Sequence, residues 1–199
     1  MPANNPGEYN IKDVKGIIWD LDNTLYRFDH NFEHACNIAA ARAALKGGVP
    51  MTMEQAVEFG WRSYRERGHS YFLFVEEYRL DETLMHHDFH SFIDETLIKK
   101  SEALVTLFEK TALNHVLVTH ASRDWAVRAL THLGLIDFFP PGHIIPAEET
   151  NFSRKNKSRL PFEKACSVLD LPSRHIAVVE DITCNLQIPY EMGLGTVLV

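Results

Sequence analysis

The stretch that decides the fold is residues 14–24, Val-Lys-Gly-Ile-Ile-Trp-Asp-Leu-Asp-Asn-Thr. Its first half, residues 14–19, is a short apolar run, which predicts a buried parallel strand near the centre of a sheet. Two carboxylates two residues apart, Asp20 and Asp22, follow directly. In an extended backbone both side chains point the same way, and charges this close need a metal ion or a shared proton. The stretch therefore predicts a central strand that ends in a reactive acidic loop.

Three more apolar runs have the length of buried strands, and helical patterns lie between the runs. The runs cover residues 115–119, 176–179 and 196–199, and the helical patterns cover residues 122–133, 161–169 and 185–192. The second of these helices begins with Pro161, and the first ends at Gly134, which are typical boundary residues. Strands that alternate with helices predict an α/β fold with a parallel sheet.

Residues 28–100 differ from the rest because they contain no strand alternation. The pattern predicts helices over residues 32–45 and 88–98, and a third that begins at the capping box Thr52–Gln55 and ends near Gly68. We therefore expect a core formed by residues 1–27 and 101–199 with an inserted helical cap of residues 28–100. An insertion at the end of a central strand would lie over the place where open α/β sheets bind ligands.

Composition excludes several classes of function. The chain has 199 residues and a formal charge of −7 without a long basic run, so we expect no nucleic-acid polymer as a partner. No window approaches 18 apolar residues, so we expect no membrane association. Three scattered cysteines (Cys36, Cys166 and Cys184) and a polar first ten residues without a signal-peptide pattern favour a reducing, cytoplasmic location. The sequence does not indicate the oligomeric state.

Acidic and polar residues also follow two of the other apolar runs. Glu180 and Asp181 follow residues 176–179, and Asn185 comes four residues after Asp181. At the edge where parallel strands end, these oxygens would meet those of Asp20, and carboxylates with water and phosphate suit Mg²⁺. Taken alone, the acidic pair equally fits a helix N-terminus.

Two further signals complete the pattern. Thr119 ends an apolar run just before a helix, which is typical of an anion site or of a plain helix cap. A basic cluster at residues 154–159 is either a solvated loop or the source of one ammonium that folds into the acidic site.

The order of these signals, D-x-D-x-T, then Thr119, a lysine and Glu180-Asp181, resembles the haloacid dehalogenase-like hydrolase superfamily. Residues 15–24 and 113–199 carry the resemblance, and the run Trp19–Tyr26 (WDLDNTLY) is most similar to the pyrimidine 5′-nucleotidase-like branch. The resemblance implies a Rossmann-like core with a cap inserted after the first motif, which agrees with the helical insertion. It differs in His120, where the superfamily usually has Asn, and in Ile182, where a small hydroxyl residue is common.

The resemblance also implies residue roles. Asp20 is the nucleophile, Asp22 the general acid and base, and Thr119 holds the phosphoryl group. Among the lysines, the spacing to Phe162 favours Lys157 over Lys155. The implied Mg²⁺ ligands are Asp20, Asp22 and Asp181. The implied supporting residues are Glu180, Asn185 and His120.

These roles predict a Mg²⁺-dependent phosphatase that acts on a small phosphorylated substrate through an aspartyl-phosphate intermediate. The preferred substrate would be a pyrimidine nucleoside 5′-monophosphate. The related dehalogenases lack the second acid, so Asp22 favours phosphoryl transfer over carbon–halogen cleavage. Two alternatives stay open: a phosphosugar or phosphoglycolate-type phosphatase or phosphomutase, and a non-catalytic ligand-binding member of the same fold.

The cap holds weaker candidates. His86 and His90 would share one helix face and could bind a transition metal, although exposed polar residues are the simpler interpretation. Most cap aromatics between Tyr64 and Tyr78 should form its core, while one or two could stack on a base. The arginines Arg62, Arg65 and Arg67 could reach sugar or base oxygens.

Overall fold

The structure, a computed structural model, describes residues 10–199, which divide into two compact units. The core unit contains residues 10–27 and Lys99–Val199, and the cap unit is Phe28–Ile98. The cap unit ends two residues before the predicted boundary at residue 100, so Lys99 and Lys100 belong to the core unit.

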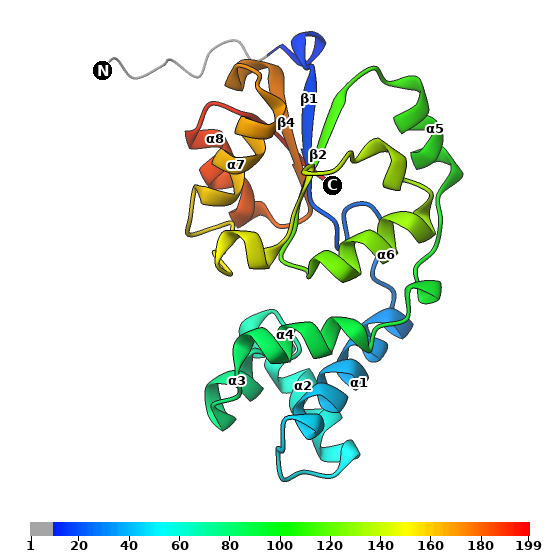
Figure 1. The fold of residues 1–199 in the computed structure, drawn as a ribbon, viewed down its shortest axis with the longest axis vertical. Helices are drawn as coiled ribbons and strands as arrows, with labels where there is room; N and C mark the ends of the chain where they lie inside the picture. Colours follow the sequence, from blue (N-terminus) through cyan, green and yellow to red (C-terminus); the bar gives the residue numbers. More distant parts are fainter. Residues whose placement is uncertain (1–9) are drawn as a thin grey trace. The chain divides into compact units, whose positions relative to one another are not determined.

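The core unit is built on a five-stranded sheet with all neighbouring strands parallel, in the order β3-β2-β1-β4-β5 (Figure 1). The strands are β1 (Gly16–Trp19), β2 (Asn114–Val118), β3 (Ile144–Ile145), β4 (Ile176–Glu180) and β5 (Gly195–Leu198). The predicted α/β fold with a parallel sheet is confirmed. β3 was not predicted, because two residues are too short to form an apolar run.

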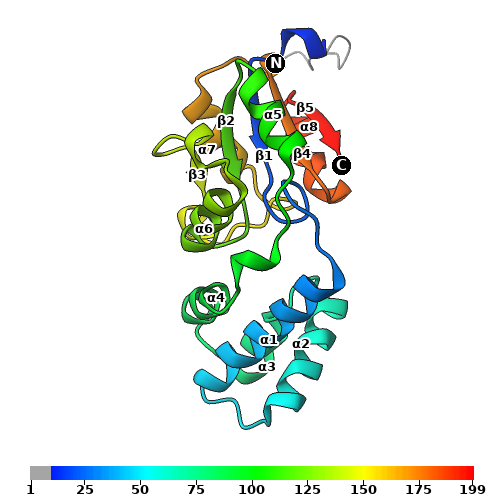
Figure 2. The same ribbon diagram turned by 90° about the vertical axis from the view of Figure 1, so that its right-hand side faces the viewer.

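Helices cover both faces of this sheet: α7 and α8 lie on one side, α5 and α6 on the other (Figures 1 and 2). Ile18 of β1 is in register with Val116 and Val178 of the neighbouring strands, and all three belong to one buried cluster with Phe162 of α7. Trp19 points to the other face, where its ring lies 5.0 Å from that of Phe108 on α5. Alternate residues of β1 therefore stabilise opposite layers, as expected for a central strand.

The helices of the core unit are α5 (Glu102–Lys110), α6 (Arg123–Leu133), α7 (Leu160–Leu169) and α8 (Gln187–Glu191). The prediction for α6 is confirmed: Ser122 accepts a hydrogen bond from the Trp125 backbone N–H (3.2 Å), and Gly134 ends the helix at φ 76°. The left-handed backbone conformation at this position costs little free energy for glycine, which has no Cβ atom. α5 was not predicted.

The cap unit consists of α1 (His30–Lys46), α2 (Met53–Arg67), α3 (Phe72–Tyr78) and α4 (Glu82–Ser91). The capping box at the start of α2 is present, with both hydrogen bonds between Thr52 and Gln55, and Gly68 ends this helix at φ 73°. Local capping chemistry therefore predicted the bounds of α2 correctly.

The predicted helix over residues 88–98 is wrong. Asp81 caps α4 by accepting from the Leu84 N–H (2.8 Å), and the helix ends at Ser91. Asp94 then accepts from the Thr96 N–H (2.9 Å) and starts a separate 3₁₀ turn at Glu95–Leu97. Asp side chains that bond to nearby backbone groups compete with a continuous helix, so the apolar periodicity here belongs to two elements.

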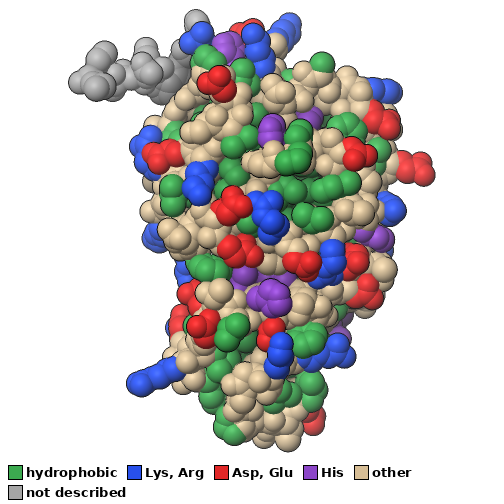
Figure 3. Space-filling model, in the orientation of Figure 1, with side chains coloured by type: hydrophobic (Ala, Val, Ile, Leu, Met, Phe, Trp, Pro, Cys, Tyr) green, Lys and Arg blue, Asp and Glu red, His purple; other side chains and the backbone are tan. Residues whose placement is uncertain are grey.

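No helix in the described part of the chain has the length and hydropathy needed to span a membrane. Acidic and basic side chains are interspersed on the face shown in Figure 3. Cys36, Cys166 and Cys184 are all free thiols. The cytoplasmic location stays a prediction.

Candidate active site

Asp20 lies at the carboxyl edge of the sheet. Its backbone N–H donates to the carbonyl of Val179 on β4 (3.0 Å), which extends the pairing one residue beyond β1. The carboxylate is held at both oxygens: Oδ2 accepts from Thr24 Oγ1 (2.9 Å), and Oδ1 lies 2.5 Å from Lys155 Nζ. Asp20 is only 6% exposed. One carboxylate is thus fixed in a buried place at the end of the central strand.

The lysine at this site is Lys155, and the prediction of Lys157 is wrong. The Lys155 ammonium lies between Asp20 and Glu180, 2.6 Å from Glu180 Oε2, and the residue is 2% exposed. Lys157 is exposed and its backbone N–H donates to the Arg154 carbonyl in a turn. Counting residues back from α7 therefore failed, because the turn sets which side chain faces the sheet.

Three carboxylates converge at the ends of β1 and β4. Asp20, Glu180 and Asp181 each offer an oxygen within 4.8 Å of the others. Asn23, at φ 63°, donates through Nδ2 to Asp181 Oδ2 (2.9 Å). Glu180 accepts from the Ile182 backbone N–H (3.2 Å) and from the side chain of Asn185, which is buried.

Asp22 is in the same loop but outside this group of carboxylates. Its Oδ1 accepts hydrogen bonds from the Tyr26 hydroxyl and from Trp125 Nε1 (3.2 Å), and its Oδ2 lies 3.5 Å from Thr119 Oγ1. The Asp22 carboxylate is therefore not among the three that converge, which include Glu180 instead, and the role of Asp22 as a Mg²⁺ ligand stays a prediction. The donors from Tyr26 and from Trp125 of α6 hold the Asp22 side chain.

Three of these contacts were missed by sequence reasoning. Thr24 and Tyr26 stand four residues after the two aspartates that they contact, a spacing that the sequence shows. Trp125 comes from α6, more than a hundred residues away, so no local pattern indicates its contact with Asp22.

Thr119 and His120 directly follow β2, and Thr119 lies beside this loop. Thr119 is 3% exposed, and its Oγ1 accepts from the Ala121 backbone N–H (2.9 Å). His120 Nε2 accepts from the Lys155 backbone N–H (3.1 Å). The predicted residues from three separate motifs are thus brought together at one sheet edge.

The electrostatics of the site are those of excess buried negative charge. Burial raises the pKa of Asp20 to about 7 against the lowering effect of Lys155, and burial also raises the pKa of Asp22 and of Asp181. Burial acts on Glu180 too, but the Lys155 ammonium outweighs it and lowers the pKa of this carboxyl. One ammonium, bound to Asp20 and Glu180, stands against four carboxyl groups, so the positive charge of Lys155 does not balance the negative charge that these groups can carry.

The donor set fits Mg²⁺. The oxygens of Asp20, Glu180 and Asp181 are hard ligands, and this cation prefers carboxylates together with water and phosphate. The fit rests on ligand type and on the uncompensated charge of the cluster.

The candidate residues of the cap unit have structural partners. His86 and His90 are 1% and 3% exposed, so the expectation that they are exposed polar residues is wrong. His86 Nδ1 lies 2.9 Å from the Tyr71 hydroxyl, and burial lowers the pKa of His86 to about 4. In the described residues the only group of three or more metal-ligating side chains is the one in the core unit. Tyr71 and Phe74 are buried in the cap core as expected.

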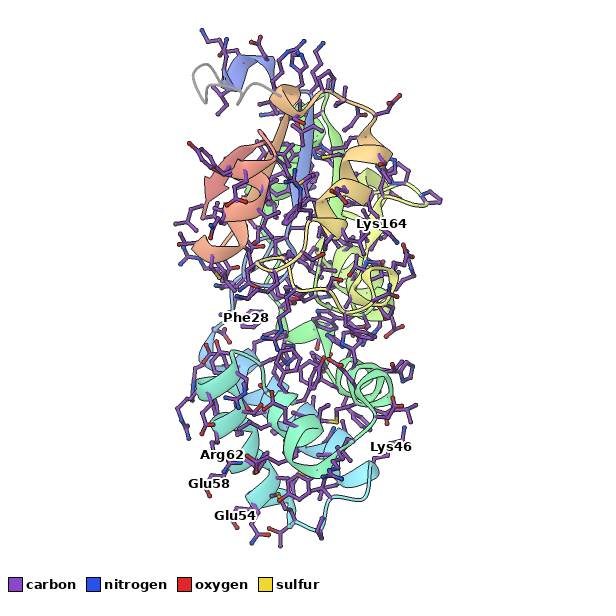
Figure 4. The ribbon with its side chains drawn as sticks, turned by 90° about the vertical axis from the view of Figure 1, so that its left-hand side faces the viewer. Phe28, Lys46, Glu54, Glu58, Arg62 and Lys164 are labelled. Atoms are coloured by element: carbon purple, nitrogen blue, oxygen red, sulfur yellow. The ribbon has the colours of Figure 1, made fainter. Side chains whose placement is uncertain are left out.

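Two of the three candidate arginines of the cap unit, Arg62 and Arg67, pair with acids of α3. Arg62, which projects from α2 in Figure 4, lies 2.5 Å from Glu77, and Arg67 Nε lies 3.0 Å from Glu76. These pairs join α2 to α3. Arg62 and Arg67 would have to leave these ion pairs to reach a substrate, and their role in substrate binding stays a prediction.

Comparisons with known structures agree with the fold. The chain is similar to YfnB from Bacillus subtilis, named as a HAD-hydrolase and bound to magnesium, with 17% identity over 94% of this chain and 88% of that chain and a TM-score of 0.60. A protein from Lactobacillus plantarum, named as a phosphoglycolate phosphatase, has 17% identity over 92% and 84% and a TM-score of 0.61. L-2-haloacid dehalogenase from Xanthobacter autotrophicus has 13% identity over 94% and 77% and a TM-score of 0.57. At these identities the likeness shows the fold alone.

A search of curated proteins finds no match. A comparison with protein families matches residues 14–183 to the haloacid dehalogenase-like hydrolase family. The match includes Asp20, Thr119, Lys155 and Glu180, which the structure brings together at one sheet edge. This chain belongs to the haloacid dehalogenase-like hydrolase family.

Proposed function

We propose that this chain hydrolyses small phosphate monoesters in a Mg²⁺-dependent reaction, with Asp20 as the nucleophile. The observation that carries the proposal is the fixed Asp20 carboxylate between Lys155 and Thr24, with a second acid, Asp22, two residues away. A carboxylate nucleophile divides a difficult hydrolysis into two easier steps.

In the first step an Asp20 oxygen attacks phosphorus, the bond from phosphorus to the leaving oxygen breaks, and protonated Asp22 gives that oxygen a proton. In the second step Asp22 takes a proton from water, whose oxygen attacks phosphorus. The bond from phosphorus to Asp20 then breaks and inorganic phosphate leaves. The raised pKa of Asp22 suits a residue that has to hold a proton before the first step.

Lys155 and Thr119 act on the phosphoryl group in this proposal. Lys155 carries a fixed positive charge beside the nucleophile, and Thr119 offers a hydroxyl close to Asp22. Preorganised charge of this kind stabilises the transition state more than the ground state. When bound by Asp20, Asp181 and Glu180, Mg²⁺ would neutralise charge on the phosphoryl oxygens.

Asp22 also favours phosphoryl transfer over dehalogenation. An alkoxide leaving group needs a proton, and in this proposal Asp22, which accepts hydrogen bonds from Tyr26 and Trp125, supplies it. A halide leaves without a proton, so the cleavage of a carbon–halogen bond does not require a general acid at this position.

For the substrate, we favour a pyrimidine nucleoside 5′-monophosphate. This preference rests on the WDLDNTLY run at Trp19–Tyr26. A phosphoglycolate or sugar phosphate is the second candidate, and the similarity to the Lactobacillus plantarum protein supports it. Comparing kcat/KM for UMP, CMP, AMP, a hexose phosphate and phosphoglycolate at one Mg²⁺ concentration decides between them. If kcat/KM for the hexose phosphate or for phosphoglycolate is higher than for both UMP and CMP, the substrate proposal is wrong while the phosphatase proposal stands.

Hydrolysis of p-nitrophenyl phosphate tests the reaction itself. We expect turnover with Mg²⁺ and none with EDTA. Absence of phosphate release across the whole substrate panel would favour a non-catalytic ligand-binding protein instead.

A further inference from the structure

Lys155 is supplied by a loop between two helical elements. Residues 151–159 connect the 3₁₀ turn at Ala147–Thr150 to α7, and the first two of them, Asn151 and Phe152, have φ of 51° and 54°. Residues other than glycine rarely adopt this left-handed backbone conformation. A loop with two such residues in succession therefore needs contacts that stabilise it. The ammonium at the end of Lys155 nevertheless has to meet two carboxylate oxygens within hydrogen-bond distance.

The backbone of Lys155 has an anchor outside its own loop. Its N–H donates to His120 Nε2 at 3.1 Å. The side chain of the same residue ends 2.5 Å from Asp20 and 2.6 Å from Glu180. Both ends of Lys155 are therefore fixed, the ammonium by acids and the main chain by an imidazole.

His120 is itself in a well-held segment at the end of β2. Thr119 N–H donates to the Ile145 carbonyl of β3 (3.1 Å), and Ala121 N–H donates to Thr119 Oγ1 (2.9 Å). The Ala121 carbonyl accepts from Ala147 N–H (3.2 Å), where the turn before the lysine loop begins. The segment Thr119–Ala121 thus contacts both the turn that precedes the lysine loop and Lys155 within that loop.

The hydrogen bond also fixes the state of the imidazole. A backbone N–H can only donate, so Nε2 of His120 has to be an unprotonated acceptor, and the ring proton is on Nδ1. Glutamine can place an amide oxygen near the position of Nε2, whereas phenylalanine keeps the ring shape and has no acceptor.

We propose that His120 is a positioning residue that sets Lys155 against Asp20 and joins the phosphoryl-binding end of β2 to the lysine loop. The inference rests on the proposed function, since Lys155 has to act on the phosphoryl group. His120 acts in this proposal through its hydrogen bond to the Lys155 backbone. A displacement of about 1 Å at a reacting centre can lower a rate by about 10²-fold, so the loss of one anchor should have a measurable effect.

The first test compares His120→Phe with His120→Gln in steady-state hydrolysis of p-nitrophenyl phosphate. We expect kcat to fall about tenfold in the Phe variant, the effect of about one lost hydrogen bond, with KM changed less than kcat. The Gln variant should stay within about twofold of the parent chain in kcat, because it restores the acceptor. Equal losses in both variants, or an unaltered Phe variant, would overturn the inference.

The second test needs no activity and no variant. In ¹⁵N NMR of the parent chain, we expect the His120 ring to have an unprotonated Nε2 and a protonated Nδ1 at pH 7.5. A ring protonated at Nε2 would overturn the inference even if both variants failed to fold. An inactive parent chain with the expected tautomer would instead count against the proposed function alone.

Discussion

Replacing Lys155 by Met tests the electrostatic account of the site, and Lys157→Met is its matched control. Met keeps most of the aliphatic length of Lys155 and removes only the ammonium. That change leaves Asp20 and Glu180 facing each other with oxygens at most 4.8 Å apart. The repulsion between these two carboxylates is present in the parent chain as well, but there the ammonium compensates it. Breaking a buried ion pair by removing one partner leaves an uncompensated buried charge and costs about 3–5 kcal/mol.

We therefore expect the free energy of unfolding of the Lys155→Met variant to fall by about 3–5 kcal/mol at pH 7.5 in EDTA. Urea unfolding followed by the fluorescence of the buried Trp19 and Trp125 measures this loss in the core unit. EDTA is needed because a divalent cation could replace the missing positive charge. Lys157 is exposed, so its replacement should change the free energy of unfolding by less than about 0.5 kcal/mol.

Activity provides the second half of the comparison. If Lys155 stabilises charge on the phosphoryl group, kcat should fall about 10²–10³-fold in Lys155→Met, the usual cost of losing such a group. Lys157→Met should keep the parent activity. The assignment of the buried ammonium would be refuted if the free energy of unfolding fell by less than about 1 kcal/mol in Lys155→Met, or fell equally in both variants.

Three further predictions follow from other parts of the chain. Asp20→Asn should abolish phosphate release, by at least about 10³-fold, with the circular dichroism spectrum unchanged; near-normal turnover in a folded variant contradicts the nucleophile assignment. Burial lowers the pKa of His115 to about 4, so the unfolded chain binds the extra proton between pH 6.5 and 4 and stability falls as the pH drops through this range. The share of His115 should be about 2 kcal/mol from pH 7.5 to 5.0, measured by urea unfolding as the difference in pH dependence between the parent chain and His115→Gln, because His86 has a similarly lowered pKa and contributes in both. Thr52→Ala breaks the capping box of α2 and should lower the free energy of unfolding of the cap unit by about 1 kcal/mol, measured by thermal denaturation against Thr96→Ala, outside that helix.

The sequence alone determined the features that depend on neighbouring residues. The apolar run that ends in Asp20 predicted β1 and its acidic loop, and Ser122 with Gly134 predicted the bounds of α6. Thr52 and Gln55 predicted the start of α2. Each of these depends on hydrogen bonds and hydrophobic periodicity within a few residues, so the printed order of side chains is sufficient information.

Tertiary structure alone decided the order of the strands and the contacts that complete the site. Lys155 rather than Lys157 meets Asp20, because left-handed residues and a turn in the preceding loop set the direction of each side chain. Trp125 reaches Asp22 from α6, and His120 reaches the Lys155 backbone from the end of β2. Residues so far apart in the chain meet only after the sheet has formed, and their distances then depend on loop backbone angles that spacing in the sequence does not encode.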